Sequence, residues 1–190
     1  LSNCAVQGYL KMKKTLILFL LVASVVFAAL EGQIEITGES DLTETSGSSR
    51  DNHRYRVQES YTSGTATTSA QINAVYRATG TLASGAAGTI DLAGSLVDPL
   101  GDAVVFTRIR SIIIENTATT TLTIGSSTSN PWTAWSSNAA STLAIPASSC
   151  IALSSPFGAW AVTAGTGDIL HITNASGGTG TYKLWIVGNE

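Results

Sequence analysis

The run from Val104 to Ile114 constrains the fold most, because it consists largely of β-branched and apolar residues. Arg108 and Arg110 are its charged positions, and they lie two residues apart, so both fall on one face of an extended strand. We predict that this arginine face is covered by solvent, by a neighbouring subunit or by an acidic loop. The opposite face is expected to be buried, and its members are Val105, Thr107, Ile109, Ser111 and Ile113.

The segment from Asp98 to Asp102, just before this run, carries the sharpest turn signal in the chain. Pro99 supplies a fixed φ and Gly101 tolerates a positive one, a combination typical of a tight turn. The spacing of these two aspartates with Asp91 does not fit an EF-hand calcium loop. We therefore expect the carboxylates to cap backbone N–H groups.

Short β-rich runs, separated by Gly, Pro and Asn, continue through the rest of the chain. Further strands are predicted at residues 74–82, 88–96, 120–124, 150–153, 160–163, 169–173 and 181–187. No helical period of convincing length competes with them. Short strands at regular spacing predict an all-β fold, an antiparallel β-sandwich that is jelly-roll-like or related.

The first 30 residues are predicted to be a hydrophobic leader. Met12 is followed by two lysines and by the apolar run Leu16 to Leu30, and Ala28 offers a small-residue cleavage site. Because a spanning helix usually needs about 20 apolar residues, this shorter run predicts a secretory signal peptide. The alternatives are an uncleaved anchor that attaches the protein to a membrane through Leu16 to Leu30, and a translation that begins upstream of the real gene.

Two segments of contrasting charge precede the predicted sandwich. Residues 31–49 are acidic and rich in hydroxyl groups, so a solvated linker is predicted, with an acidic arm that docks on a neighbour's arginine face as the alternative. Residues 50–61 are basic and aromatic, and we predict an extended arm with Arg54, Tyr55 and Arg56 as its contact residues. The predicted organisation is therefore a leader at 1–30, a linker and arm at 31–60, and a β-sandwich domain at 61–190.

Charged residues are scarce in this chain. After the leader it carries seven basic residues against thirteen acidic ones, a net charge of −6. This balance argues against a nucleic-acid partner. A surface dominated by Thr, Ser, Ala and Gly suits packing against protein, so we expect the protein itself, as a homo-oligomer, among the partners.

The chain shows no residue pattern typical of catalysis or of cofactor binding. Asp168 and His171 are three residues apart on a strand and so fall on opposite faces, and His53 is the only other histidine. We therefore predict neither an enzyme nor a metal site or other cofactor. Trp132 and Trp135 lie in a loop, where they are predicted to form a lid on the sandwich or to contact a neighbouring subunit. The alternative is that their indoles stack on sugar rings.

The order of these elements is distinctive. It runs TLASGAAGTIDLAGSLVDPLGDAVVFTRIRSIIIENT, TLTIG, NPW, WAVTAGTGDILHITNASG and YKLWIVG, within residues 54–188. This succession resembles small structural proteins found in tailed-bacteriophage and prophage gene sets. The resemblance implies a β-sandwich that decorates or completes a particle, and it brings no active-site residues. A signal peptide departs from this pattern, because phage proteins assembled in the cytoplasm need none. The options are a virion that carries membrane, a bacterial surface protein with the same module, or a false upstream extension.

We therefore predict a non-enzymatic structural protein of a virus particle, a decoration, spike or minor capsid component. It is expected to act through multivalent contacts with its own copies and with other virion or surface proteins. The predicted subunit contacts are Arg108, Arg110, Trp132 and Trp135, and the predicted arm contacts are Arg54, Tyr55 and Arg56. The competing predictions are a secreted carbohydrate-binding module, in which Trp132 and Trp135 stack on a glycan, and a bacterial surface or filament subunit. The predicted location is the virion, or the cell exterior if the leader is cleaved.

Overall fold

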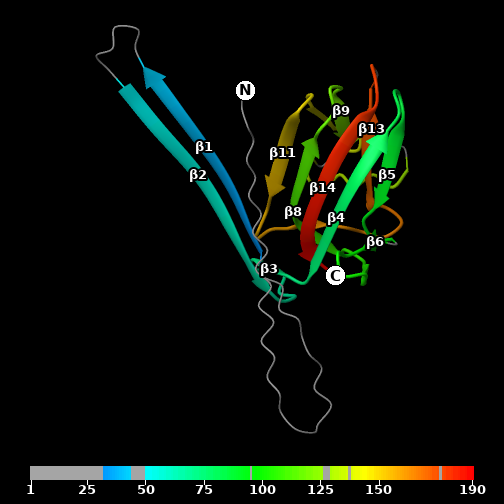
Figure 1. Ribbon diagram of the computed structural model, residues 1–190. Helices are drawn as coiled ribbons and strands as arrows, with labels where there is room; N and C mark the ends of the chain where they lie inside the picture. The colour runs from blue at the N-terminus through cyan, green and yellow to red at the C-terminus, as the bar shows by residue number, and fades with distance from the viewer. Residues whose placement is uncertain (1–31, 44–49, 95, 126–128, 137, 176) are drawn as a thin grey trace. The chain divides into compact units, whose positions relative to one another are not determined.

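The computed structural model describes residues 32–43, 50–94, 96–125, 129–136, 138–175 and 177–190 (Figure 1). The chain divides after Thr62 into two compact units. The predicted leader, with Met12 and the apolar run Leu16 to Leu30, lies outside the described residues. Within the described ranges, no helix has the length and apolar character needed to cross a membrane.

The first unit contains a long two-stranded ribbon. β1 (Gly32–Thr43) pairs antiparallel with β2 (Arg50–Ser63) over twelve positions. The solvated linker predicted for residues 31–49 is therefore wrong for β1, whereas the extended conformation predicted for residues 50–61 is confirmed by β2. The composition argument failed because it weighed only apolar burial, while a partner strand satisfies the backbone N–H and C=O groups of β1.

The second unit is built from short strands. They are β3 (Gln71–Ile72), β4 (Ala74–Leu82), β5 (Ala87–Asp91), β6 (Leu96–Val97), β7 (Ala103–Val104), β8 (Arg108–Asn116), β9 (Leu122–Gly125), β10 (Thr142–Ile145), β11 (Ser149–Ser154), β12 (Trp160–Ala161), β13 (Ile169–Asn174) and β14 (Gly180–Asn189). Sheet I has the order β11-β8-β14-β4, with β12 also paired to β8, and sheet II has the order β10-β9-β13-β5. β3 neighbours β2 in the sheet that also holds β1, and β6 and β7 form a separate hairpin. The single strand predicted at 88–96 is divided between β5 and β6, because the N–H of Gly94 donates to the carbonyl of Asp91 and closes a turn.

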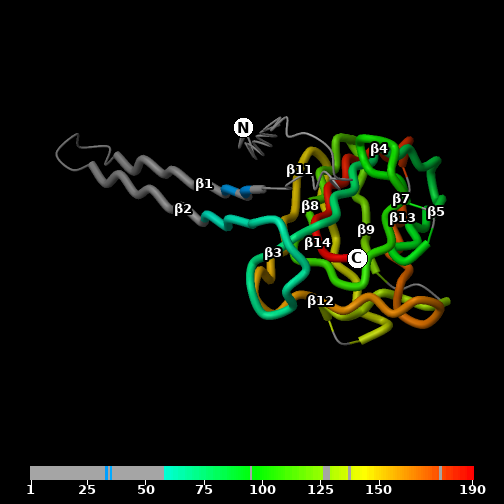
Figure 2. Tube along the Cα trace, turned by 90° about the horizontal axis from the view of Figure 1, so that it is seen from below, coloured from blue at the N-terminus to red at the C-terminus, as the bar shows by residue number. Residues whose placement is uncertain are grey.

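The strand pairing follows a chain that is doubled back on itself. β4 pairs with β14, β5 with β13, β8 with β11 and β9 with β10, all antiparallel. The domain is thus one long hairpin with its tip between β9 and β10, rolled up so that its strands fall in two sheets. The pairs β8 with β14 and β9 with β13 complete these sheets, which lie as two layers in the view of Figure 2. This nested pairing is the jelly-roll arrangement, so the predicted all-β sandwich is confirmed.

One hydrophobic core fills the space between the two sheets. Ile112 and Ile114 from β8 and Leu184 and Ile186 from β14 are nearly inaccessible to solvent. They belong to the same cluster as the inward residues of sheet II, which are Leu122, Ile124, Leu170 and Ile172. Burial of each side chain of this kind stabilises the fold by roughly 1.5–3 kcal/mol, so the core, and not the sparse charges, holds the domain together.

Three buried asparagines stand at strand ends. Asn116, Asn174 and Asn189 are the last residues of β8, β13 and β14, and all three are almost fully buried. Each side-chain amide donates to two or three backbone carbonyl oxygens in neighbouring segments. These amides therefore tie connecting segments to the ends of the strands.

Candidate functional site

A β-bulge decides which face each residue of β8 occupies. The pairing of β8 with β14 shifts register between Val187 and Gly188, which leaves Arg110 as the extra residue. One extra residue moves every later side chain to the other face of the sheet. Ile112 therefore lies in the core, and Ile113, which simple alternation predicted to be buried, is partly exposed.

Arg110 is 0% exposed, so the prediction that it contacts a neighbouring subunit is wrong. Its Nε donates to Oδ1 of Asn189 at 3.1 Å, and its terminal amino groups donate to the carbonyl oxygens of Pro156 and, at 2.7 Å, of Ala66. Hydrogen bonds from a charged donor are stronger than neutral ones. Arg110 thus clamps the connection after β11, the segment before β3 and the final strand inside the domain.

The two loop tryptophans lie in different environments. Trp132 is 3% exposed, its Nε1 donates to the carbonyl of Ala161 at 3.0 Å, and its ring meets Trp160 edge-on with centroids 6.3 Å apart. Trp132 therefore forms the predicted lid, and the predictions of glycan stacking or subunit contact are wrong for it. Trp135 is partly exposed, with its Nε1 donating to the carbonyl of Trp132 at 3.1 Å, and Arg108 is also partly exposed. These two predicted contact residues remain at the surface.

The predicted arm contacts lie on β2. In the register of the ribbon, Arg54, Tyr55 and Arg56 are opposite residues 37–39 of β1. Their side chains lie outside the described part of the structure. Their role as contacts therefore stays a prediction.

The predicted turn is confirmed as the tip of the β6–β7 hairpin. Oδ1 of Asp98 accepts hydrogen bonds from the N–H groups of Leu100 at 2.8 Å and Asp102 at 2.9 Å. Gly101 adopts a φ of 99°, in the region that favours glycine. The capping role predicted for Asp98 is therefore confirmed, and its bonds stabilise the turn.

The same hairpin carries most of the large apolar side chains that the described residues expose. Leu100 is 66% exposed at the tip, and Val97 and Val105 are exposed beside it, while Phe157 lies in another loop. Val105 was predicted to be buried, but Val104 of β7 takes the core position in its place. We call Val97, Leu100 and Val105 the apolar tip, because these three exposed apolar residues lie on or next to one hairpin, and grouped exposed apolar residues mark contact surfaces more often than a single residue does.

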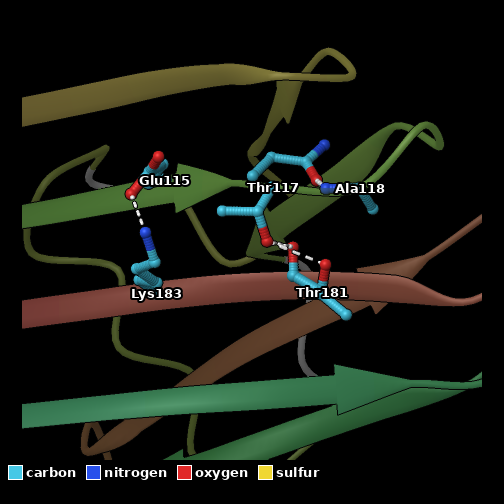
Figure 3. Close-up of polar contacts among 6 residues, drawn as sticks. Glu115, Thr117, Ala118, Thr181 and Lys183 are labelled. Carbon is cyan, nitrogen blue, oxygen red and sulfur yellow. Dashed lines mark hydrogen bonds and ion pairs between the residues drawn. The ribbon is translucent and has the colours of Figure 1, made fainter. Parts of the chain in front are cut away.

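Sheet I carries apolar and basic residues on the face turned away from the core. Trp185 lies between Arg77 of β4 and Ile113 of β8 in one cross-strand row. Trp185 and Ile113 are partly exposed and Arg77 is exposed. In the adjacent row, Nζ of Lys183 lies 3.1 Å from Oε2 of Glu115 (Figure 3). We call these residues the outer face of sheet I. Sequence reasoning missed this face, although the alternation of Lys183 and Trp185 with apolar neighbours was a usable signal.

The remaining polar candidates are not brought together. Oδ2 of Asp168 accepts from the N–H of Gly165 at 2.5 Å, and Nδ1 of His171 lies 3.2 Å from the carbonyl oxygen of Gly125. Among the residues that the structure describes, no group of three or more His, Cys, Asp or Glu side chains is placed to hold a metal ion. No family model matches the chain, and no curated protein matches it.

Proposed function

We propose that the protein is a structural component of a virus particle, a decoration, spike or minor capsid subunit that acts through repeated contacts between copies. The jelly roll supports this proposal, because the same arrangement builds viral capsid domains. It also builds lectins and cupins, so the fold by itself does not decide the function.

The observation that carries the proposal is the β1–β2 ribbon. It pairs over twelve positions, a long arm for a small protein. In its sheet, β2 also neighbours β3, which has only two residues. A sheet this narrow gains little stability by itself, because edge strands present N–H and C=O groups to further partners. Another copy of the chain, or another particle protein, would supply a further strand.

The test is to quantify the protein in purified particles by mass spectrometry and to measure its intact mass and its assembly size by light scattering. We expect a constant number of copies per particle and an assembly larger than a monomer. Absence from particles, with the protein found only free or on the cell surface, would refute the proposal. A mass that begins at Ala29 would indicate export and favour a surface subunit, whereas a mass that begins at Met12 would favour a membrane-associated virion protein.

A carbohydrate-binding module is the second candidate, and the partly exposed ring of Trp135 is the observation that favours it. Because Trp132 is buried in the core, replacing both tryptophans would confuse loss of binding with loss of folding. The clean test is Trp135→Ala alone, with the exposed Phe157→Ala as the matched aromatic control. Retention on a polysaccharide column that is unchanged by Trp135→Ala would remove this candidate.

A further inference from the structure

The apolar tip is presented in a prearranged form. The two hydrogen bonds to Oδ1 of Asp98, at 2.8 and 2.9 Å, fix the turn that carries Leu100. A turn whose backbone is held in this way loses little backbone entropy when a partner covers it. The carboxylates of Asp98 and Asp102 lie on either side of Leu100 in the chain, so the tip combines an apolar centre with two negative charges.

The outer face of sheet I has the complementary composition. Its centre is apolar, with Trp185 beside Ile113, and Arg77 and Lys183 place two positive charges around this centre. Glu115 offsets the charge of Lys183, to which it is paired. Arg77 is exposed at the end of the row, where a carboxylate from outside can approach it.

The charges of the tip indicate which partner it fits. Two carboxylates beside Leu100 would be repelled by an anionic lipid surface. The same chain carries a face with apolar residues and cations. Because the tip and the outer face are different surfaces, a contact between them is head-to-tail and can repeat into a ring or a filament.

We infer that the apolar tip of one copy docks on the outer face of sheet I of a second copy. Leu100 packs on Trp185 and Ile113, and the carboxylates of Asp98 and Asp102 lie near Arg77. This inference rests on the proposed function, for which it supplies the contact between subunits.

The contact is tested by measuring self-association of the full chain by sedimentation over a range of concentrations. Leu100→Ser removes the apolar centre of the tip, and we expect it to raise the dissociation constant about 10- to 100-fold. Arg77→Asp places like charges in the contact and is expected to weaken it by about tenfold or more. The matched control is Phe157→Ser, because Phe157 is 67% exposed, as Leu100 is 66% exposed, but lies outside the tip. The control is expected to associate like the unmodified chain.

A mixing experiment tests the head-to-tail geometry. Leu100→Ser keeps the outer face intact and Arg77→Asp keeps the tip intact. An equal mixture therefore retains one working contact and should form heterodimers, whereas each variant alone should associate only weakly. Near-ultraviolet circular dichroism checks that each variant is folded. If the unmodified chain is monomeric, the proposed self-assembly fails together with this inference. If it assembles and both variants assemble equally well, or if Phe157→Ser is as disruptive as Leu100→Ser, only this inference is overturned.

Discussion

Replacing the buried Asn116 by alanine should cost much more stability than its small volume suggests. Its Nδ2 group donates to the carbonyl oxygens of Thr120, Ile145 and Pro146 at 2.7, 2.9 and 2.9 Å. Its Oδ1 accepts from the N–H of Ala118 at 3.0 Å. The side chain thus joins the end of β8 to the turns that follow β8 and β10.

The expected loss of unfolding free energy follows from the number of hydrogen bonds that the side-chain amide can make. Two N–H groups and one acceptor make about three full hydrogen bonds, each with a net contribution of ~1 kcal/mol. Any buried group left without a partner adds a desolvation cost of ~1–3 kcal/mol, so Asn116→Ala should lower the free energy of unfolding by at least ~3 kcal/mol. With a urea m value of ~2 kcal/mol/M, the unfolding midpoint falls by at least ~1.5 M.

Urea unfolding, monitored by tryptophan fluorescence, measures this shift in the midpoint. The matched control is Asn138→Ala, because Asn138 is exposed and its side-chain oxygen accepts one hydrogen bond, from Ala140 at 2.9 Å. The control should cost less than about 1 kcal/mol. An Asn116→Ala variant that loses no more stability than Asn138→Ala would show that these hydrogen bonds do not hold the turns, and the reasoning would be refuted.

Three other changes have defined outcomes. A methyl group at Gly188 would overlap the backbone carbonyl of Arg108 at the bulge. Gly188→Ala should therefore lower the free energy of unfolding, measured in urea, by at least ~2–3 kcal/mol. In the control Gly167→Ala the methyl group makes only ordinary contacts, so the loss should be about 1 kcal/mol or less. Burial raises the pKa of Tyr182 above its usual value of 10.0, so the stability due to its neutral form is complete below about pH 10 and is lost as the pH rises through the folded-state pKa. Tyr182→Phe should therefore flatten the alkaline decline in stability, and an unchanged decline would contradict this assignment. Arg110→Met should lower the unfolding free energy by at least ~2 kcal/mol, because buried acceptors lose their donor, and a stability equal to that of the unmodified chain would argue against the clamp.

Much of the fold could be predicted because strands and turns leave local signals. The strand predicted at residues 74–82 coincides with β4, and the Pro-Gly turn after Asp98 lies at the tip of a hairpin. The linker prediction is wrong for residues 32–43, because the strand they form depends on pairing with β2, which composition does not report. Trp132 and Arg110, predicted as surface contacts, are internal because their hydrogen-bond acceptors come from segments far away in the chain.

The sequence by itself determined that this chain is an antiparallel β-sandwich. Strand periodicity and turn residues are local signals, which can be read from neighbouring positions without knowing the tertiary contacts. It also placed a tight turn where the exposed Leu100 is found. Only the tertiary structure decided which face each residue of β8 occupies, because the bulge at Arg110 arises from pairing with β14. Only the tertiary structure brought Arg77, Trp185 and Ile113 into one row, because cross-strand neighbours belong to segments that meet when the doubled chain rolls into two sheets.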